Sequence, residues 1–194
     1  MELLPTLVST GWASGVNAYA TVALLGILGR LGWGDVPEPL TEDPVIAGAA
    51  VMYAIEFVTD KIPLVDNTWD LVHTAIRPAI GGALGVEFAS LDGANEVVGG
   101  IEAGGVALVS HGVKAGLRLA INTSPEPLSN IIVSTLEDLA VAGVVLLALE
   151  YPEIAAAISM TLLVIGIILV ILVAGLIRTA WRRWRNRHHY GRGP

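Results

Sequence analysis

The sequence predicts an all-α integral membrane protein with about six transmembrane helices, on the evidence of its composition and its apolar runs. Of its 194 residues, 54% are hydrophobic and only 15% are charged. Soluble domains carry about 45 to 50% apolar and roughly 25% charged residues, so the apolar excess has to face lipid. A spanning helix needs about 20 mostly apolar residues. Six such runs follow one another: Leu7–Leu31, Pro44–Asp60, His73–Ser90, Val97–Ala120, Asn130–Leu149 and Ile154–Ile177.

The first run is predicted to be a membrane helix of the mature protein. It follows Met-Glu-Leu-Leu-Pro without a basic segment, and its apolar stretch is too long for a signal peptide. The chain has no cysteine, which excludes disulfides, thiolate metal sites and cysteine nucleophiles.

The basic residues predict the orientation. Six of the eleven Lys and Arg follow the last apolar run, at positions 178, 182, 183, 185, 187 and 192. By the positive-inside rule this tail is cytoplasmic. Six crossings then place the N-terminus inside as well, and residues 31–43, 91–96 and 150–153 outside. None of these three loops contains Lys or Arg, in agreement with that topology.

An internal repeat divides the chain. Pro-Glu-Pro-Leu occurs at 37–40 and again at 125–128, and Arg30-Leu31 before the first copy matches Arg118-Leu119 before the second. Each unit holds three helices, and because three is odd the second unit is inverted relative to the first, as in many secondary transporters. The predicted parts are 1–90 and 91–177 as two repeats and 178–194 as a basic cytoplasmic tail.

The first helix of each repeat is rich in glycine, around Thr10–Tyr19 and Val98–Gly105. Broken or re-entrant helices at matching positions of two halves mark binding sites in transporters. Small residues also allow close helix packing in membranes. Both interpretations stand for Gly11, Gly15, Gly99, Gly100, Gly104 and Gly105, whereas the larger polar group of Asn17 favours a functional role.

Ionisable residues inside a bilayer are costly and normally face a cavity or a partner. On the predicted topology they gather in the cytoplasmic half, where we expect a polar, wet vestibule. The proposed substrate- or ion-binding residues are Asn17, Glu56, Asp60, Arg77, His111, Lys114, Arg118, Glu137 and Asp138. Carboxylates outnumber bases there, and histidine suits proton relay, which favours binding of a proton or cation. A purely structural network of ion pairs is the alternative.

A metal site is a weaker alternative. Asp66, Asp70 and His73 recur at helical spacing and could coordinate a metal ion such as Mn or Zn. No recognised metal motif such as His-Glu-x-x-His is present, and no cofactor is expected.

Three segments carry a family resemblance: Ser14–Tyr19 (SGVNAY), Glu56–Pro78 (EFVTDKIPLVDNTWDLVHTAIRP) and His111–Lys114 (HGVK). The chain resembles, over nearly everything before the tail, the bacterial membrane family called domain of unknown function 4126. The resemblance implies a multi-pass protein of the bacterial plasma (inner) membrane, and as the family's name states it implies no activity, substrate or catalytic residues.

The sequence therefore favours a small transporter of a proton- or cation-coupled solute. Two alternatives remain: a flippase or carrier of a phosphorylated lipid, favoured by Arg30 and Arg118 at matched ends of the repeats, and a structural or scaffolding membrane protein. Enzyme chemistry is not expected, because no P-loop, nucleophile elbow or dinucleotide motif is present. The expected partners are membrane lipids and a second copy in a homodimer, without nucleic acid.

Overall fold

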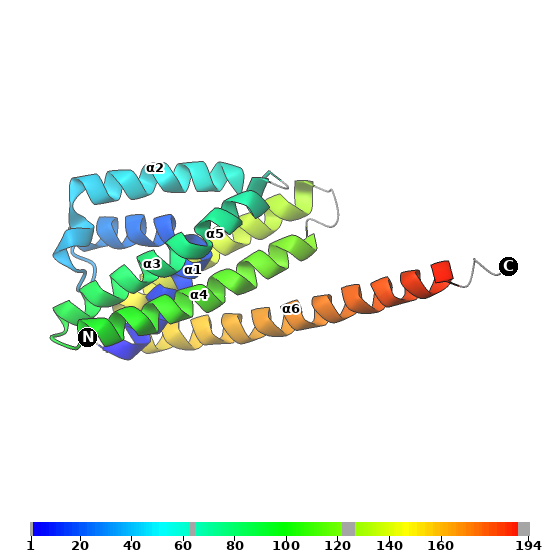
Figure 1. Cartoon of the computed structure of the whole chain (residues 1–194). Helices are drawn as coiled ribbons and strands as arrows, with labels where there is room; N and C mark the ends of the chain where they lie inside the picture. The colour runs from blue at the N-terminus through cyan, green and yellow to red at the C-terminus, as the bar shows by residue number, and fades with distance from the viewer. Residues whose placement is uncertain (1, 63–64, 122–126, 190–194) are drawn as a thin grey trace.

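The protein is all α-helical over the residues that the structure describes. The computed structural model covers residues 2–62, 65–121 and 127–189, without the side chains of residues 66, 127, 184 and 186–189. This part of the chain forms six α-helices and one short 3-10 helix, which confirms the predicted all-α class (Figure 1). The elements are α1 (Leu3–Arg30), η1 (Glu38–Thr41), α2 (Asp43–Thr59), α3 (Val65–Leu91), α4 (Glu96–Ile121), α5 (Pro127–Glu150) and α6 (Pro152–His189).

The first helix is broken in the middle. Asn17 has φ −149° and ψ 96°, which is extended backbone between two helical halves. The first half runs alongside α4, because Ser110 donates a hydrogen bond to the Trp12 carbonyl at 3.0 Å and Lys114 donates one to the Val16 carbonyl at 3.0 Å. The second half turns back, and Gly26 packs against Ile46 at the start of α2. The sequence-based expectation of a broken first helix is thereby met in α1, whereas α4 is unbroken.

Both ends of α1 lie at the same end of the bundle. Glu2 lines a crevice with Tyr151 and Glu153 at the α5–α6 junction, and Gly34 packs against Leu149 close by. We call this the N-terminal end; α6 starts there and runs past the opposite, far end (Figure 1). The prediction that both chain termini lie on the cytoplasmic side stays a prediction; in the structure the described start of α1 lies at the N-terminal end and the described end of α6 lies beyond the far end.

The other helices run alternately between the two ends. Helices α2, α4 and α6 run away from the N-terminal end, and α3 and α5 return to it (Figure 1). The three connections that lack Lys and Arg, after α1, after α3 and after α5, therefore all lie at the N-terminal end. The three loops that were predicted to share one side, because they lack Lys and Arg, therefore do lie at one end of the bundle. The second Pro-Glu-Pro-Leu copy lies mostly outside the described residues, as do Arg192 and the side chain of Arg187.

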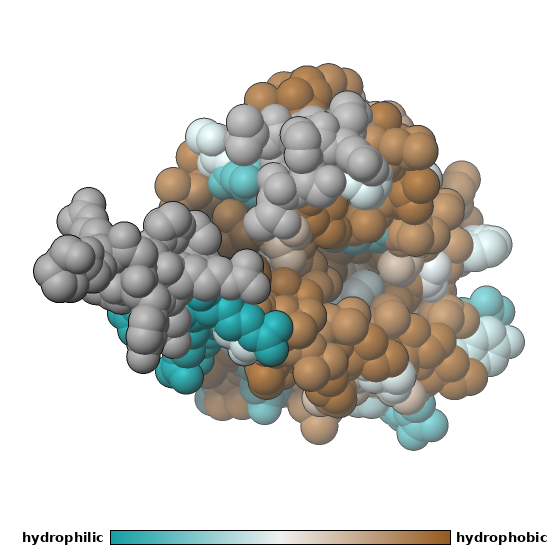
Figure 2. Space-filling view, turned by 90° about the vertical axis from the view of Figure 1, so that its right-hand side faces the viewer, coloured by the Kyte–Doolittle hydropathy of each residue, from teal (hydrophilic) through white to brown (hydrophobic). Residues whose placement is uncertain are grey.

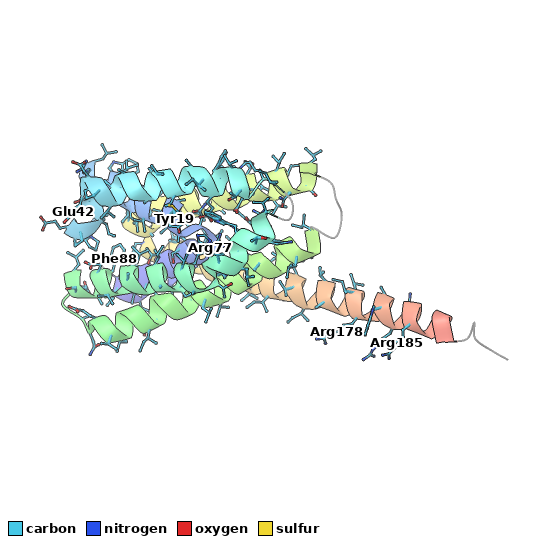
Figure 3. All side chains as sticks on the ribbon, turned by 45° about the horizontal axis from the view of Figure 1, so that its top comes forward. Tyr19, Glu42, Arg77, Phe88, Arg178 and Arg185 are labelled. Carbon is cyan, nitrogen blue, oxygen red and sulfur yellow. The ribbon has the colours of Figure 1, made fainter. Side chains whose placement is uncertain are left out.

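Three of the described helices are long and apolar enough to cross a membrane: α1, α5 and α6. Figure 2 views the molecule from the far end and shows mostly apolar side chains around the rim of the bundle. Helix α6 continues well beyond the rest of the bundle, with Leu172, Leu176 and Trp181 exposed on it. Arg178 and Arg185 follow on this projecting part (Figure 3).

Glycine packing holds the N-terminal half of the bundle together. A Cβ on Gly85 of α3 would lie 2.1 Å from the Gly99 carbonyl oxygen of α4, and a Cβ on Gly104 would lie 3.1 Å from the Pro78 carbonyl oxygen. Such approach of two backbones is possible only where both helices carry small residues.

The same packing decides the role of the other predicted glycines. A Cβ on Gly11 or Gly15 would lie within 2.6 Å of an α4 backbone oxygen, and one on Gly100 would lie 2.9 Å from the Val86 side chain. Gly105 has no neighbour within 4 Å. Five of the six glycines therefore pack closely against a neighbouring helix, as the packing interpretation predicts, whereas Gly105 has no neighbour in contact and lies away from the helix break.

Substitution at two of these glycines should separate packing from helix propensity. Gly85→Ala forces α3 and α4 apart, and overpacking of this kind costs about 1 to 3 kcal/mol. Gly105→Ala adds a methyl group to open space and gains helix propensity, so it should leave the apparent Tm equal or higher. Thermal unfolding of both variants in one detergent measures the difference. Equal Tm values would contradict the close α3–α4 contact.

Because both ends of α1 lie at one end of the bundle, we predict a specific labelling pattern. Because the protein has no native cysteine, Glu2→Cys, Asp35→Cys and Arg185→Cys each introduce a single thiol. An impermeant maleimide added to one side of sealed vesicles should label positions 2 and 35 together and position 185 only from the other side. Labelling of positions 2 and 185 from the same side would mean that α1 crosses the membrane.

Candidate functional site

Charged side chains from four helices meet inside the half of the bundle nearest the far end. Asp60 caps the end of α2, Arg118 lies in the last turn of α4, and Asn130 lies in the first turn of α5. We call the connected charged groups the buried ion network. Seven members are joined by ion pairs: Glu56, Asp60, Asp70, Arg77, Lys114, Arg118 and Glu137. The eighth is Asp138, which contacts Asn17 and Lys61 beside them.

Arg77 is the centre of the network on α3. Its Nη2 donates to Glu56 Oε1 at 2.6 Å, and its Nη1 lies 3.1 Å from Asp70 Oδ1. Arg77 and Glu56 are both fully buried. Side chains of this kind are stable inside a protein only as hydrogen-bonded pairs, so α2 and α3 are tied together at this point.

His111 is held as a neutral ring. Arg77 Nη1 lies 2.9 Å from His111 Nδ1, and because a guanidinium can only donate, Nδ1 carries no proton. His111 Nε2 lies 3.2 Å from the Thr74 hydroxyl, which itself donates to the Asp70 carbonyl at 3.0 Å. The ring therefore donates through Nε2. A second proton on this ring would break the bond to Arg77, so the predicted proton relay through His111 receives no support from this geometry.

Lys114 joins three elements. Its Nζ donates to Asp60 Oδ2 at 2.7 Å and to the Val16 carbonyl at 3.0 Å, where α1 breaks. Glu56 and Glu137 lie 3.7 and 3.6 Å from the same ammonium group. The ammonium thus compensates both the carboxylates and a backbone carbonyl that the helix break leaves without its helical partner.

Arg118 links α4 to both α2 and α5. Its Nη2 donates to Glu137 Oε2 at 2.5 Å, and its Nη1 donates to the Asp60 carbonyl at 2.8 Å and to Asn130 Oδ1 at 2.9 Å. Asn130 in turn donates to the same Asp60 carbonyl at 3.1 Å. The C-terminus of α2 is therefore closed by side chains of the two neighbouring helices.

The helix break reaches the network through Asn17. Its Nδ2 donates to Asp138 Oδ1 at 3.1 Å, while its Oδ1 accepts the Ala20 backbone N–H at 2.9 Å and so caps the second half of α1. Lys61 Nζ lies 3.8 Å from Asp138 Oδ2, and this oxygen has no hydrogen bond. Asp138 is consequently the network carboxylate that touches the broken helix.

The described candidate metal ligands, His73 and Asp70, contact other protein groups instead of one another. His73 Nδ1 donates to the Trp69 carbonyl at 2.8 Å, and its Nε2 lies 2.9 Å from the Tyr19 hydroxyl, so both ring nitrogens are used. Asp70 pairs with Arg77. The side chain of Asp66 lies outside the described residues. Within the described part of the chain no group of His, Asp and Glu is arranged to hold a metal ion.

The site is buried, which corrects the expectation of a wet vestibule. Glu56, Arg77 and Arg118 are 0% exposed. The side chains of Glu137 and Asp138 are the least buried of the network, at 17% and 13%. The helices pack around the charges because the carboxylates and bases neutralise one another, and an open water-filled cavity is not needed to solvate them.

The buried carboxylates are nevertheless not fully neutralised and hydrogen-bonded by the other side chains. Glu56 Oε2, Asp60 Oδ1 and both oxygens of Asp70 are buried without a hydrogen bond. Among the described side chains, the network together with Lys61 holds five carboxylates and four cations. The carboxylates are Glu56, Asp60, Asp70, Glu137 and Asp138, and the cations are Lys61, Arg77, Lys114 and Arg118. The arrangement has capacity for one further positive charge, either a proton or a monovalent cation.

The structure brings all nine predicted binding residues together, although their binding of a solute stays a prediction. Sequence reasoning missed Lys61 and Asn130 as parts of the site, and Tyr19 as the partner of His73 beside it. Lys61 directly follows the predicted Asp60, and Tyr19 lies two residues after the predicted Asn17, which was a usable signal. No sequence signal pointed to Asn130, because an asparagine at the start of a helix ordinarily serves as its N-cap.

A comparison with known protein families matches residues 4–172 to the family described as Domain of unknown function (DUF4126). The chain belongs to this family. The DUF4126 match spans every residue of the buried ion network and ends before the basic part of α6. It confirms the resemblance carried by Glu56–Pro78. Comparisons with curated proteins and with solved structures found no match.

Matched substitutions should show how strongly the network supports the fold. Arg77→Met leaves Glu56 and Asp70 buried without their shared cation, and losing one partner of such a pair costs about 3 to 5 kcal/mol. Arg30→Met breaks an exposed pair with Asp43, whose side chain is 83% exposed, and such pairs contribute about 0 to 1 kcal/mol. Apparent Tm values in one detergent should show a much larger loss for Arg77→Met. Equal losses would mean that the network is solvated.

Proposed function

We propose that the protein is a small secondary transporter for a proton- or cation-coupled solute in the bacterial inner membrane. The observation that carries the proposal is the hydrogen bond between Asn17, at the break of α1, and Asp138 of the buried ion network. Transporters commonly place discontinuous helices and ionisable groups together near the middle of the membrane. Irregular backbone at that depth is tolerated only where protein or a cavity surrounds it.

The proposed topology has five crossing helices, α2 to α6, with α1 re-entering from the outer side. The basic residues of α6 put the far end in the cytoplasm under the positive-inside rule, and the loops without Lys and Arg then face outward. The N-terminus lies on the outer side in this arrangement. The buried ion network lies in the cytoplasmic half of the bundle.

The two proposed repeats are α1–α3 and α4–α6. Corresponding helices α2 and α5, and likewise α3 and α6, run in opposite directions, which supports an inverted arrangement. The repeats differ at their first helices, because α1 is broken and α4 is straight. Movement of one unit against the other would provide alternating access, with the α1 hairpin as the flexible element.

Asp138 is the proposed coupling residue. Its Oδ2 has no hydrogen bond, and the ion pair of this oxygen with Lys61 is long, at 3.8 Å. A proton or cation at Asp138 would balance the fifth carboxylate of the cluster and weaken the acceptor of the Asn17 hydrogen bond. Binding of the coupling ion would thereby change the interaction that holds the helix break against α5.

Proton flux in proteoliposomes tests the proposal. Vesicles that contain a pH-sensitive dye are exposed to jumps of Na⁺, of K⁺, or of a mixture of amino acids, sugars, nucleosides and amines. The wild type should give a pH response to at least one jump, and Asp138→Asn should abolish it because asparagine keeps the Asn17 contact but cannot take up a proton. Glu150→Gln, at an exposed carboxylate of the N-terminal end, is the matched control and should respond as the wild type does.

Two results would overturn the transporter proposal. One is the absence of any protein-dependent response to all of these jumps. The other is an unchanged response in a folded Asp138→Asn variant, since the coupling ion would then bind elsewhere.

A further inference from the structure

A cavity of about 270 Å³ adjoins the buried ion network. It lies where α4 and α5 hardly touch each other and α6 packs across both. The walls are apolar, with Trp12 from α1, Ala140 from α5 and Leu163 and Gly166 from α6. Its polar lining groups are Ser110, Lys114 and Glu137, so one part of the cavity borders the network and the rest is suited to a hydrocarbon body.

The cavity opens sideways, toward the position of the lipid. Leu136, Ile165 and Leu169 line it and are each more than two-fifths exposed on the flank of the bundle. A molecule dissolved in the bilayer could enter between α5 and α6 without passing through water. This lateral opening favours ligands that partition into membranes over strongly polar solutes.

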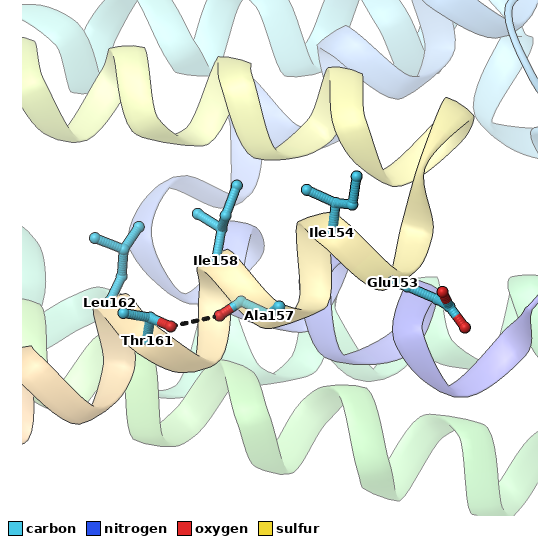
Figure 4. Close-up of a pocket in the computed structure, with 6 residues that line it drawn as sticks. All are labelled: Glu153, Ile154, Ala157, Ile158, Thr161 and Leu162. Atoms are coloured by element: carbon cyan, nitrogen blue, oxygen red, sulfur yellow. Dashed lines mark hydrogen bonds between the residues drawn. The ribbon is translucent and has the colours of Figure 1, made fainter.

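An apolar groove of about 410 Å³ continues the cavity toward the N-terminal end. Ile154, Ile158 and Leu162 form its wall at four-residue spacing along one face of α6 (Figure 4). Leu162 lines both the groove and the cavity. An alkyl chain longer than the cavity could therefore extend along α6, where Glu153 lies at the other end of the groove.

The accessible polar atoms of the cavity are hydrogen-bond acceptors. The side chain of Lys114 is only 3% exposed, and its ammonium donates to Asp60 and Val16 within the network. The side chain of Glu137 is 17% exposed, and its two oxygens accept from Arg118 at 3.4 and 2.5 Å, which leaves each oxygen able to accept a further hydrogen bond. The Ser110 hydroxyl already donates to the Trp12 carbonyl. A ligand head in this position has to donate hydrogen bonds. A positive head is further favoured, because it would balance the fifth carboxylate.

We propose that this cavity binds an amphipathic amine, with its apolar body between α4, α5 and α6 and its ammonium group on the Glu137 carboxylate. The inference rests on the proposed function and names the substrate class of the transporter. A bound ammonium and a bound proton each neutralise the same surplus charge. Release of one on binding of the other would exchange protons for the amine.

Fluorescence of Trp12 reports binding directly. Full-length protein in phosphatidylcholine nanodiscs is titrated with dodecylammonium that carries bromine on its chain, since bromine quenches a tryptophan that it contacts. A saturable quenching component should appear in the wild type and be absent from Trp12→Phe, which separates Trp12 from lipid-facing tryptophans. Dodecyl phosphate with the same brominated chain should bind at least tenfold more weakly.

Matched variants locate the site. Ala140→Leu fills the cavity, whereas Ala142→Leu adds the same volume on the same helix away from the cavity lining. The first should weaken the saturable component at least tenfold and the second should leave it unchanged. Glu137→Gln should weaken binding of the ammonium more than binding of the uncharged brominated dodecanol.

The outcomes distinguish this inference from the proposed function. Absence of saturable quenching, or quenching that Ala140→Leu leaves intact, would overturn the cavity as a ligand site even if Asp138-dependent flux is present. Tighter binding of dodecyl phosphate would overturn the amine assignment and favour a carrier of phosphorylated lipid. Saturable amine binding without any Asp138-dependent flux would support the site and overturn the transporter proposal.

Discussion

Charges inside an apolar bundle have to be neutralised by other side chains, because lipid offers no water to do so. Asp60 shows how much of the structure depends on this constraint. Its carboxylate accepts from Lys114, and its carbonyl accepts from both Arg118 and Asn130. These bonds join the end of α2 to α4 and α5, which otherwise hardly touch each other. The positions of α2, α4 and α5 at the site are thus tied together by one group of charges.

The two halves of the bundle are held together by different physical means. Near the N-terminal end, glycines allow the backbones of α3 and α4 to touch, and dispersion forces between close surfaces provide the stability. Toward the far end the helices separate and polar side chains span the wider spaces. Close packing leaves no room for a ligand, whereas a network with unbonded carboxylate oxygens and an adjoining cavity does. The candidate site therefore lies in the half of the bundle that charged and polar side chains hold together, beyond the region of close backbone packing.

The break in α1 connects these two regions. Its first half packs through Gly11 and Gly15 onto α4, and the chain then leaves helical geometry at Asn17, beside Asp138 and Lys114. A break at this depth frees backbone groups that need partners, and Lys114 supplies one by donating to the Val16 carbonyl. Charge at the site and the conformation of the hairpin are thus linked through direct hydrogen bonds. This link is the physical basis on which both proposals rest.

The sequence by itself determined the all-α class, the loops that lie at one end of the bundle, and nine residues of the site, of which seven belong to the buried ion network and two, Asn17 and His111, contact it. Three local properties are visible in the sequence alone: the length of the apolar runs, the absence of Lys and Arg from three loops, and the spacing of charges along the helices. Only the tertiary structure decided that α1 turns back at Asn17, because a run of 28 residues is long enough to cross a membrane whether or not it bends. The same holds for the burial of the site and the cavity beside Glu137. Which carboxylate meets which base, and how much space remains between α4 and α5, depend on helix packing that no local pattern encodes.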